Sequence, residues 1–196
     1  MEQSVFVKHQ QLSAFPPAKL LYIIYRRLRE QGVPTTWYWI VDKVARKVQG
    51  VSPQTLSRIQ PLLYVGGQHR RQGLPRMRTW GIKAVVNMRA EADDAARGLA
   101  LEHYLWLPVA DDHDPTFDQL LQGARFIQEQ IAAGNGVYIH CASGVGRAPT
   151  MAAAYLVMRG MDSETAWKTV LRGRPFIRPT PPQLEVIEDF AEALLV

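Results

Sequence analysis

Cys141 is the only cysteine in a chain of 196 residues, and its neighbours could support nucleophilic chemistry. It follows the apolar run "VYIH" and precedes the loop "ASGVG" and a pattern that predicts a helix. Small residues let the backbone N–H groups of such a loop turn toward one centre. Next to a helix N-terminus, these N–H groups form an anion-binding site. The predicted anion site consists of the residues after the cysteine: Ala142, Ser143, Gly144, Val145, Gly146 and Arg147.

The surroundings predicted for Cys141 favour a thiolate over a thiol. Inward-facing amides, a helix dipole and a nearby guanidinium all stabilise the anionic sulfur, which makes it a ready nucleophile at neutral pH. Arg147 follows six positions later, and its planar guanidinium can hold two oxygens of a tetrahedral dianion. This combination suits attack on phosphorus. Because a solitary cysteine forms no disulfide within the chain, we expect a reduced, intracellular, cytoplasmic setting.

Four apolar stretches predict the strands that would position this loop, at residues 61–67, 82–88, 103–109 and 136–140. Helical patterns accompany them: a short one at 73–81, an amphipathic one at 117–131, and three that start near residues 148, 163 and 182. This alternation indicates an α/β fold with a mostly parallel central sheet of four to five strands flanked by helices. Ligands of such folds bind beyond the carboxyl ends of strands, where Cys141 is expected.

The first 58 residues differ in charge from the rest of the chain. They carry 9 Lys and Arg against 3 Asp and Glu, whereas residues 59–196 carry 14 against 15. Two helical patterns within them are separated by the break "QGVPT". We therefore divide the chain into a basic helical N-terminal extension, residues 1–58, and a main domain, residues 59–196. The positive net charge belongs to the extension and says little about what the main domain binds.

Residues 17–47 of this extension have two interpretations. Their apolar and aromatic side chains lie beside Arg26, Arg27 and Arg29, a composition that could contact an anionic membrane. Amphipathic helices of soluble proteins mostly pack on a neighbouring domain instead. We expect packing, with peripheral membrane contact as the alternative. The start of the chain lacks the order of a secretory signal, and the run "LLYIIY" is too short to span a bilayer, so we expect a soluble protein.

The residues around the cysteine also resemble a known signature. His140, Cys141, five further residues and Arg147 look like the signature of the cysteine-dependent protein tyrosine phosphatase superfamily. The segments "LLYVGGQ", "GIKAVVNMR", "LPVADDHDPTFDQL" and "RPFIRPTPPQL" are similar to its dual-specificity branch, particularly the PTPMT1-like lipid-phosphate phosphatases. The resemblance covers about residues 59–195. It implies a dual-specificity phosphatase-like catalytic domain and a two-step reaction through a phosphocysteine intermediate.

The resemblance further implies an aspartate, in a loop before the signature, that protonates the leaving oxygen and later activates water. The stretch "PVADDHDP" offers Asp111, Asp112 and Asp114. Spacing from the strand-ending Pro108 favours Asp111, whereas alignment on the Asp-His pair favours Asp112. We expect Asp111 to be the general acid and keep Asp112 as the alternative. The other acidic residues would belong to a solvated loop.

Four further residues carry weaker indications. His140 resembles the family histidine that orders the loop through hydrogen bonds, although a histidine at a strand end is more often only structural. Gln183 resembles a position that helps to place water, although a glutamine at a helix start usually faces solvent. Arg174 and Arg178 could line an electropositive rim or be surface charges. We expect no metal or other cofactor, because no second histidine stands at ligand spacing from the aspartates.

The sequence thus predicts a cysteine-dependent phosphatase for phosphomonoesters. Its partners would be phosphoproteins, modified on Tyr, Ser or Thr, or a phospholipid such as phosphatidylglycerophosphate, and no nucleic acid. Ala148 stands where the family often has Ser or Thr, whose hydroxyl helps the thiolate leave, so a non-catalytic phosphate-binding adaptor is the alternative. Rhodanese-like sulfur transfer is disfavoured because that chemistry needs no arginine at this spacing.

Overall fold

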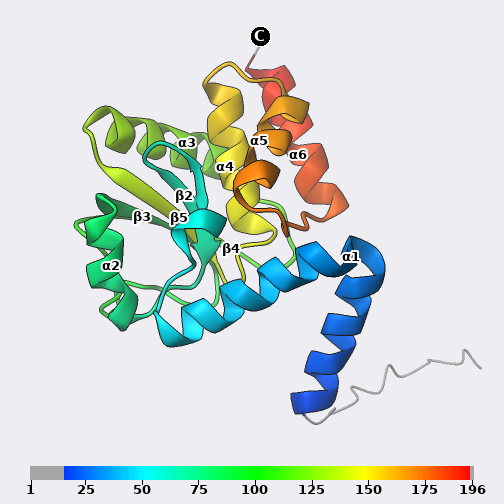
Figure 1. Cartoon of the computed structure of the whole chain (residues 1–196). Helices are drawn as coiled ribbons and strands as arrows, with labels where there is room; N and C mark the ends of the chain where they lie inside the picture. The colour runs from blue at the N-terminus through cyan, green and yellow to red at the C-terminus, as the bar shows by residue number, and fades with distance from the viewer. Residues whose placement is uncertain (1–15, 195–196) are drawn as a thin grey trace, which may run out of the picture.

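A five-stranded sheet with the order β1-β2-β5-β3-β4 forms the centre of the structure, a computed structural model that describes residues 16–194 (Figure 1). Strand β1 pairs with β2 in antiparallel orientation, and the other neighbouring strands are parallel. The strands are β1 (Arg58–Gln60), β2 (Leu63–Gly67), β3 (Ile82–Arg89), β4 (His103–Val109) and β5 (Gly136–Cys141). The expected α/β class and mostly parallel sheet are confirmed.

Within residues 16–194, six α-helices surround this sheet (Figure 1). They are α1 (Pro16–Val48), α2 (Leu74–Thr79), α3 (Phe117–Ala132), α4 (Arg147–Met158), α5 (Ser163–Gly173) and α6 (Pro181–Ala193), with short 3₁₀ turns at Gln54–Leu56 and Arg71–Gly73. Helix α2 packs on one face of the sheet, and the bundle of α3 to α6 covers the other. Every expected strand and helix is present. Strand β1 was not anticipated, because "RIQ" is too short to show an alternating pattern.

The elements that flank Cys141 are almost entirely buried. All six residues of β5 are buried, as expected for a central parallel strand covered on both faces. Helix α4 is buried from Arg147 to Val157, and its alanines let α3, α5 and α6 approach closely. Close-packed interiors resist displacement, so the loop between β5 and α4 has rigid supports at both ends.

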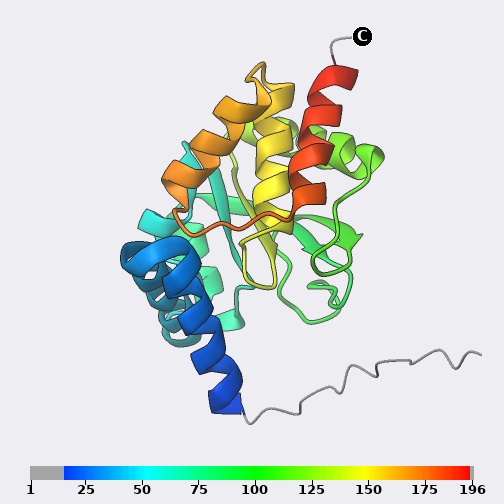
Figure 2. The ribbon, with the colours of Figure 1, turned by 90° about the vertical axis from the view of Figure 1, so that its right-hand side faces the viewer.

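Helix α1 bends sharply at Gly32, whose φ of 78° lies in the left-handed region that glycine tolerates. This kink falls in the "QGVPT" break and divides α1 into the two helices expected from the sequence. Figure 2 shows the first half pointing away from the sheet and the second half lying against the body of the molecule. Trp39 and Ala45 of the second half are buried, and Trp39 clusters with Leu56 and Phe176.

Packing of the second half of α1 makes it part of the main body of the structure. The division of the chain at residue 58 stays a prediction, and residues 1–15 of the extension lie outside the described part. None of the helices within residues 16–194 combines the length and the mean hydropathy that crossing a membrane requires.

Candidate active site

The loop from Cys141 to Arg147 joins the carboxyl end of β5 to the first turn of α4, as the sequence predicts. The N–H group of Gly144 donates to Cys141 Sγ at 3.2 Å. Gly144 has a φ of 66°, and a Cβ atom there would collide with the backbone of Gly66 on the neighbouring strand. Only glycine therefore lets the loop turn its amide toward the sulfur at this point.

A hollow of about 130 Å³ opens above this loop. Its walls are Asp111, Asp112, Cys141, Ser143, Val145, Gly146, Arg147, Arg178 and Gln183. The structure thus brings together both expected catalytic residues, both candidate acids and Gln183. Ala142 and Gly144 are absent from the walls of the hollow: the Gly144 amide donates to Cys141 Sγ, and the Ala142 carbonyl accepts hydrogen bonds from Gln68 N and Arg46. The hollow is lined by the Cys141 thiol and the guanidinium groups of Arg147 and Arg178, and its size suits a small anion.

Arg147 is almost fully buried, and its guanidinium binds four partners: Glu91, Asp111 and the carbonyls of Val109 and Met88. Nη1 and Nη2 donate to the two carboxylate oxygens of Glu91 at 3.0 and 3.2 Å, and Nη2 also donates to Asp111 Oδ1 at 2.6 Å. The Val109 carbonyl accepts a further hydrogen bond from Nη1 at 2.7 Å. Burial alone would lower the pKa of Arg147, but Glu91, Cys141 and Asp111 outweigh it and raise the pKa. The side chain is fixed as a cation at the wall of the hollow.

Glu91 is a site residue that the sequence analysis missed. Burial alone would raise the pKa of its carboxyl, but hydrogen bonds from Arg147 and Arg89 lower it to about 2. Glu91 follows the end of β3 by two residues, at the same sheet edge as the cysteine loop. Charged residues directly after a strand at that edge were the available signal, and "RAEADD" carried it.

The loop after β4 places the candidate acids unequally. The Asp111 carboxylate accepts a hydrogen bond from Arg147. The Asp112 backbone has a φ of 61°, and the Asp112 carbonyl accepts a hydrogen bond from the Thr180 hydroxyl at 3.4 Å. Asp114 is exposed and is absent from the walls of the hollow. The imidazole Nδ1 of His113 lies 2.9 Å from the Asp111 carbonyl oxygen, which helps to shape the turn. Both candidate acids stay within the site, and Asp111 alone bonds to Arg147.

Comparison with known proteins agrees with this geometry. The profile of a family described as a polymorphic toxin system DSP-PTPase phosphatase matches residues 64–161, half of the chain. The chain belongs to this family. It is a dual-specificity-type, PTPMT1-like member of the cysteine-dependent protein tyrosine phosphatase superfamily. The expected family is therefore confirmed.

Similar curated proteins include two mammalian phosphatases. The human phosphatidylglycerophosphatase and protein-tyrosine phosphatase 1 is 36% identical over 77 residues, 39% of this chain and 38% of the relative. Mouse dual specificity protein phosphatase 2 is 33% identical over 100 residues, 50% of this chain and 31% of the relative. The chain thus aligns with well under half the length of these relatives.

Solved structures align over more of the chain. A crystal structure of PTPMT1 in complex with PI(5)P has a TM-score of 0.64 at 26% identity, covering 70% of this chain and 95% of that one. Human DUSP28 gives the same TM-score of 0.64 at 21% identity, covering 71% and 98%, which supports the fold alone.

Gln183 connects three parts of this DSP-PTPase site. It is buried at the start of α6, where its side-chain oxygen accepts from Thr180 N at 3.1 Å to complete a capping box. Its Nε2 donates to the His113 carbonyl at 2.7 Å, and its amide lies so close to Gly146 that a Cβ there would meet it. Gln183 therefore ties the acid loop to the cysteine loop. Its role in placing water stays a prediction.

His140 lies in a buried polar cluster behind the DSP-PTPase loop. Its Nε2 is 2.8 Å from Asp94 Oδ2, and its Nδ1 is 3.4 Å from the Cys141 carbonyl oxygen. Gln68 donates to the other oxygen of Asp94, and Nε2 of His69 lies 2.8 Å from the Leu99 carbonyl oxygen. Burial first, and the neighbouring His140 second, lower the pKa of His69 to about 4.

This cluster also contains a set of side chains that could ligate a cation. Among residues 16–194, the atoms of His69, Asp94 and His140 lie within 4.8 Å of one another. The contacts to the Leu99 carbonyl and to Gln68 already engage one atom of His69 and one of Asp94. We therefore assign the cluster to positioning His140.

Arg174 binds the carbonyl groups of the cysteine loop. Both sequence interpretations of Arg174, as a residue of an electropositive rim and as a surface charge, are wrong, because its side chain is buried. It is fully buried, and its guanidinium donates to the carbonyls of Gly144 and Ser143, the latter at 3.1 Å. Asp42 of α1 accepts from Arg174 at 3.2 Å and from Arg46 at 2.9 Å. Burial would raise the pKa of Asp42, but these two cations lower it. Arg178, by contrast, does line the hollow.

Ala148 is buried in the first turn of α4, and the nearest hydroxyl on that helix has another partner. The Thr150 hydroxyl donates to the Gly146 carbonyl at 3.0 Å. This bond directs the Thr150 hydroxyl to the backbone of its own helix.

Proposed function

We propose that this protein is a cysteine-dependent phosphatase that hydrolyses phosphate monoesters through a phosphocysteine intermediate. One observation carries the proposal: Cys141 Sγ, which accepts the Gly144 amide at 3.2 Å, shares a hollow of about 130 Å³ with the cationic Arg147. A phosphate dianion there would be held by the guanidinium, with its phosphorus facing the sulfur. Family membership supports the same chemistry.

The reaction would take two displacements at phosphorus. In the first, Sγ bonds to phosphorus while the ester P–O bond breaks, and Asp111 gives its proton to the leaving oxygen. In the second, a water molecule gives a proton to the Asp111 carboxylate and attacks phosphorus. The S–P bond then breaks, which releases inorganic phosphate and restores the thiolate.

The contact between Asp111 and Arg147 suggests how substrate engages the acid. A phosphate dianion competes with the Asp111 carboxylate for Nη2, because both are acceptors for the same donor. Glu91 keeps its two hydrogen bonds to the guanidinium and holds the guanidinium in place during the exchange. Asp111 would then turn toward the ester oxygen.

Hydrolysis of an aryl phosphate in the presence of a metal chelator tests the activity. We expect turnover by the full chain and none by Cys141→Ser, with Ser163→Ala, outside the hollow, as a control that keeps activity. Activity in Cys141→Ser would contradict the proposal. Phosphate trapped on Cys141 without release would indicate a phosphate-binding adaptor instead.

We propose a phosphoprotein or a lipid phosphate as substrate. The PTPMT1 complex with PI(5)P favours lipids, and the relatives named dual specificity protein phosphatases favour phosphoproteins. The name of the relative phosphatidylglycerophosphatase and protein-tyrosine phosphatase 1 covers both classes. A panel of phosphotyrosine and phosphoserine peptides, phosphoinositides and phosphatidylglycerophosphate decides between them through kcat/KM.

Peripheral membrane contact through α1 is a further proposal. Helix α1 exposes apolar and aromatic side chains, namely Leu21, Tyr22, Tyr25, Leu28, Val33, Trp37, Tyr38, Val44 and Val48. Trp39, by contrast, is buried and cannot contribute. Sedimentation with anionic vesicles should weaken in the full-length double variant Leu21→Ser and Trp37→Ser. Equal sedimentation of variant and parent would remove the idea.

A further inference from the structure

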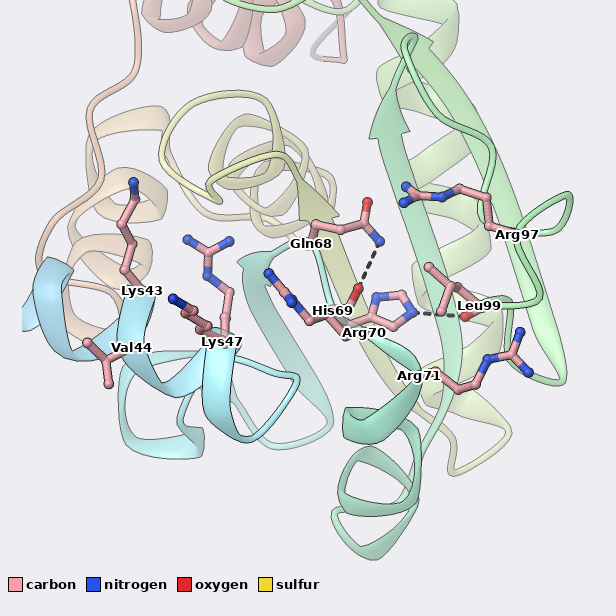
Figure 3. A pocket seen from close by; sticks show the side chains of 10 residues that line it. Lys43, Val44, Lys47, Gln68, His69, Arg70, Arg71, Arg97 and Leu99 are labelled. Atoms are coloured by element: carbon pink, nitrogen blue, oxygen red, sulfur yellow. Dashed lines mark hydrogen bonds between the residues drawn. The ribbon is translucent and has the colours of Figure 1, made fainter. Parts of the chain in front are cut away.

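A second and larger hollow, of about 900 Å³, lies beside the loop after β2 (Figure 3). We call it the basic pocket. Its walls come from α1, from the segment after β2 and from the segment before β4, and they are Lys43, Val44, Arg46, Lys47, Gln68, His69, Arg70, Arg71, Arg97 and Leu99. It shares no lining residue with the hollow above Cys141.

The charge of the basic pocket is one-sided. Six of its ten lining residues are Lys or Arg, and none is Asp or Glu. Arg46 is paired with Asp42, but no carboxylate within residues 16–194 lies within 4.0 Å of the other five cations. These five side chains are exposed, and in Figure 3 those of α1 stand opposite Arg97, with Arg70 between them and Arg71 pointing away from α1. Cations thus approach one space from three segments of the chain.

Crowding of like charges has an electrostatic cost at this place. Partial burial, Arg46 and Arg27, in that order, lower the pKa of Lys43. A bound anion would offset the repulsion between Lys43 and Arg46, which both line the basic pocket.

The floor of the basic pocket is fixed by contacts beneath it. Arg46 is held by Asp42 and by the Ala142 carbonyl, and it lies so close over Gly67 that a Cβ there would collide with its guanidinium. Gln68 is held by Asp94 at 3.0 Å. A fixed floor with flexible Lys and Arg side chains around it is a preorganised anion site.

We infer that the basic pocket binds a small anion that carries several phosphate groups, at a site separate from the hollow above Cys141. The number of unpaired cations favours several phosphates over one. The concave shape and volume fit a small molecule. No Phe, Tyr or Trp lines the basic pocket and the ring of His69 is fully buried, which disfavours stacking of nucleic-acid bases. Phosphate groups of this kind occur on soluble polyphosphates and on lipid headgroups.

Arg46 connects this site to the cysteine loop. Its Nη1 donates to the carbonyl of Ala142, the residue directly after Cys141. A ligand bound to Arg46 in the basic pocket would therefore contact the same guanidinium that holds the backbone of that loop. The inference itself does not depend on the proposed function, since none of the unpaired cations lies in the hollow above Cys141.

Titration of the full chain with inositol hexakisphosphate, followed by calorimetry at low ionic strength, tests this inference. Orthovanadate, a tetrahedral phosphate mimic, is added first to fill the hollow above Cys141 and prevent turnover. We compare the parent with the triple variant Lys47→Gln, Arg71→Gln and Arg97→Gln. The matched control is Lys83→Gln, Arg125→Gln and Arg159→Gln, which removes three exposed cations outside the basic pocket. Circular dichroism and thermal unfolding confirm that each variant folds.

The parent should bind, the control should bind within about threefold of it, and the pocket variant should bind at least about tenfold more weakly. Equal weakening by both triple variants would overturn the inference, because the attraction would then come from net charge alone. Failure of the vanadate-loaded parent to bind would also overturn it.

A parallel arm with phosphatidylcholine vesicles, with and without a bisphosphorylated phosphoinositide, identifies the source of the phosphates. Site-dependent binding to these vesicles points to a lipid headgroup, and site-dependent binding to the soluble probe alone points to a free polyphosphate. Either result supports the basic pocket as the binding site.

Discussion

Arg147 owes its position to a neighbour that is distant in sequence. Both oxygens of Glu91 bind its guanidinium, which leaves Nη2 as the group shared by Asp111 and an incoming phosphate. The arrangement separates two tasks: Glu91 holds the guanidinium in place, and Asp111 exchanges with substrate. Substitutions at these two carboxylates should therefore have different consequences.

We expect Glu91→Gln to lower the free energy of unfolding by about 1 kcal/mol at pH 7, a small effect because Glu91 is partly exposed. The folded-state pKa of Glu91, about 2, lies below its unfolded value of about 4.5. Its contribution is therefore complete above pH 4.5 and is lost as the pH falls toward 2. Urea unfolding at several pH values measures this, with exposed Glu185→Gln as the control. A difference that persists at pH 2 would contradict the account.

Asp111→Asn should lower kcat for an alkyl phosphate by about 10²- to 10⁴-fold, because the leaving oxygen then lacks a proton donor. Asp112→Asn, its matched neighbour, should change kcat by less than about tenfold. Steady-state kinetics on both variants decide between the two carboxylates. The opposite ranking would assign the acid to Asp112.

At the scale of elements, helix α1 supports the cysteine loop from below. Asp42 pairs with Arg174, which donates to two loop carbonyls, and Arg46 donates to a third. The loop therefore directs the Gly144 amide to the sulfur, while the carbonyls of Ala142, Ser143 and Gly144 are bound by Arg46 and Arg174. This division of donors and acceptors keeps the loop in an anion-binding conformation.

We predict that Asp42→Asn lowers the free energy of unfolding by about 3–5 kcal/mol, because the buried Arg174 loses its counter-charge. Glu30→Gln, which breaks the exposed pair with Arg178, should cost less than about 1 kcal/mol. Urea denaturation compares the two. Equal costs would mean that Asp42 is not needed to hold Arg174.

Local sequence patterns predicted most of these elements but not the contacts between them. The strands, the start of α4 and the kink in α1 follow from apolar periodicity and from glycine and proline positions, which act over a few residues. The pairs Glu91–Arg147 and Asp42–Arg174 join residues 56 and 132 positions apart. Such pairs depend on which segments meet at one sheet edge, and no local pattern encodes that.

The same limit explains the error about Arg174. An arginine between two helices usually lies on the surface, and only the packing of α1 shows that this one is enclosed. The cysteine loop was predictable because all of its functional groups come from seven consecutive residues.

At the scale of the whole molecule, the buried cluster behind the loop makes stability depend on pH. His69 is buried beside His140, and its pKa of about 4 lies below the unfolded value of about 6.5. Between these values the unfolded chain binds more protons at this position than the folded one. Stability should therefore fall as the pH is lowered from 6.5 to 4.

We expect this group to remove about 2–3 kcal/mol of stability over that interval, and His69→Gln to flatten the dependence. Gln keeps a donor that can reach the Leu99 carbonyl and does not titrate. His103→Gln, at an exposed position of β4, should leave the dependence unchanged. Urea unfolding of all three proteins from pH 7 to 4 provides the comparison, and an unaltered slope in His69→Gln would be inconsistent with this assignment.

The sulfur of Cys141 as acceptor of a phosphoryl group is the central claim, and rapid acid quench during turnover of an aryl phosphate tests it most directly. Mass spectrometry of the digested protein should find one phosphoryl group on the peptide that contains Cys141, and none in Cys141→Ser. The account would be contradicted by steady turnover with the phosphoryl group on a different residue. It would also be contradicted if Cys141 stayed unmodified at every quench time and Cys141→Ser remained active.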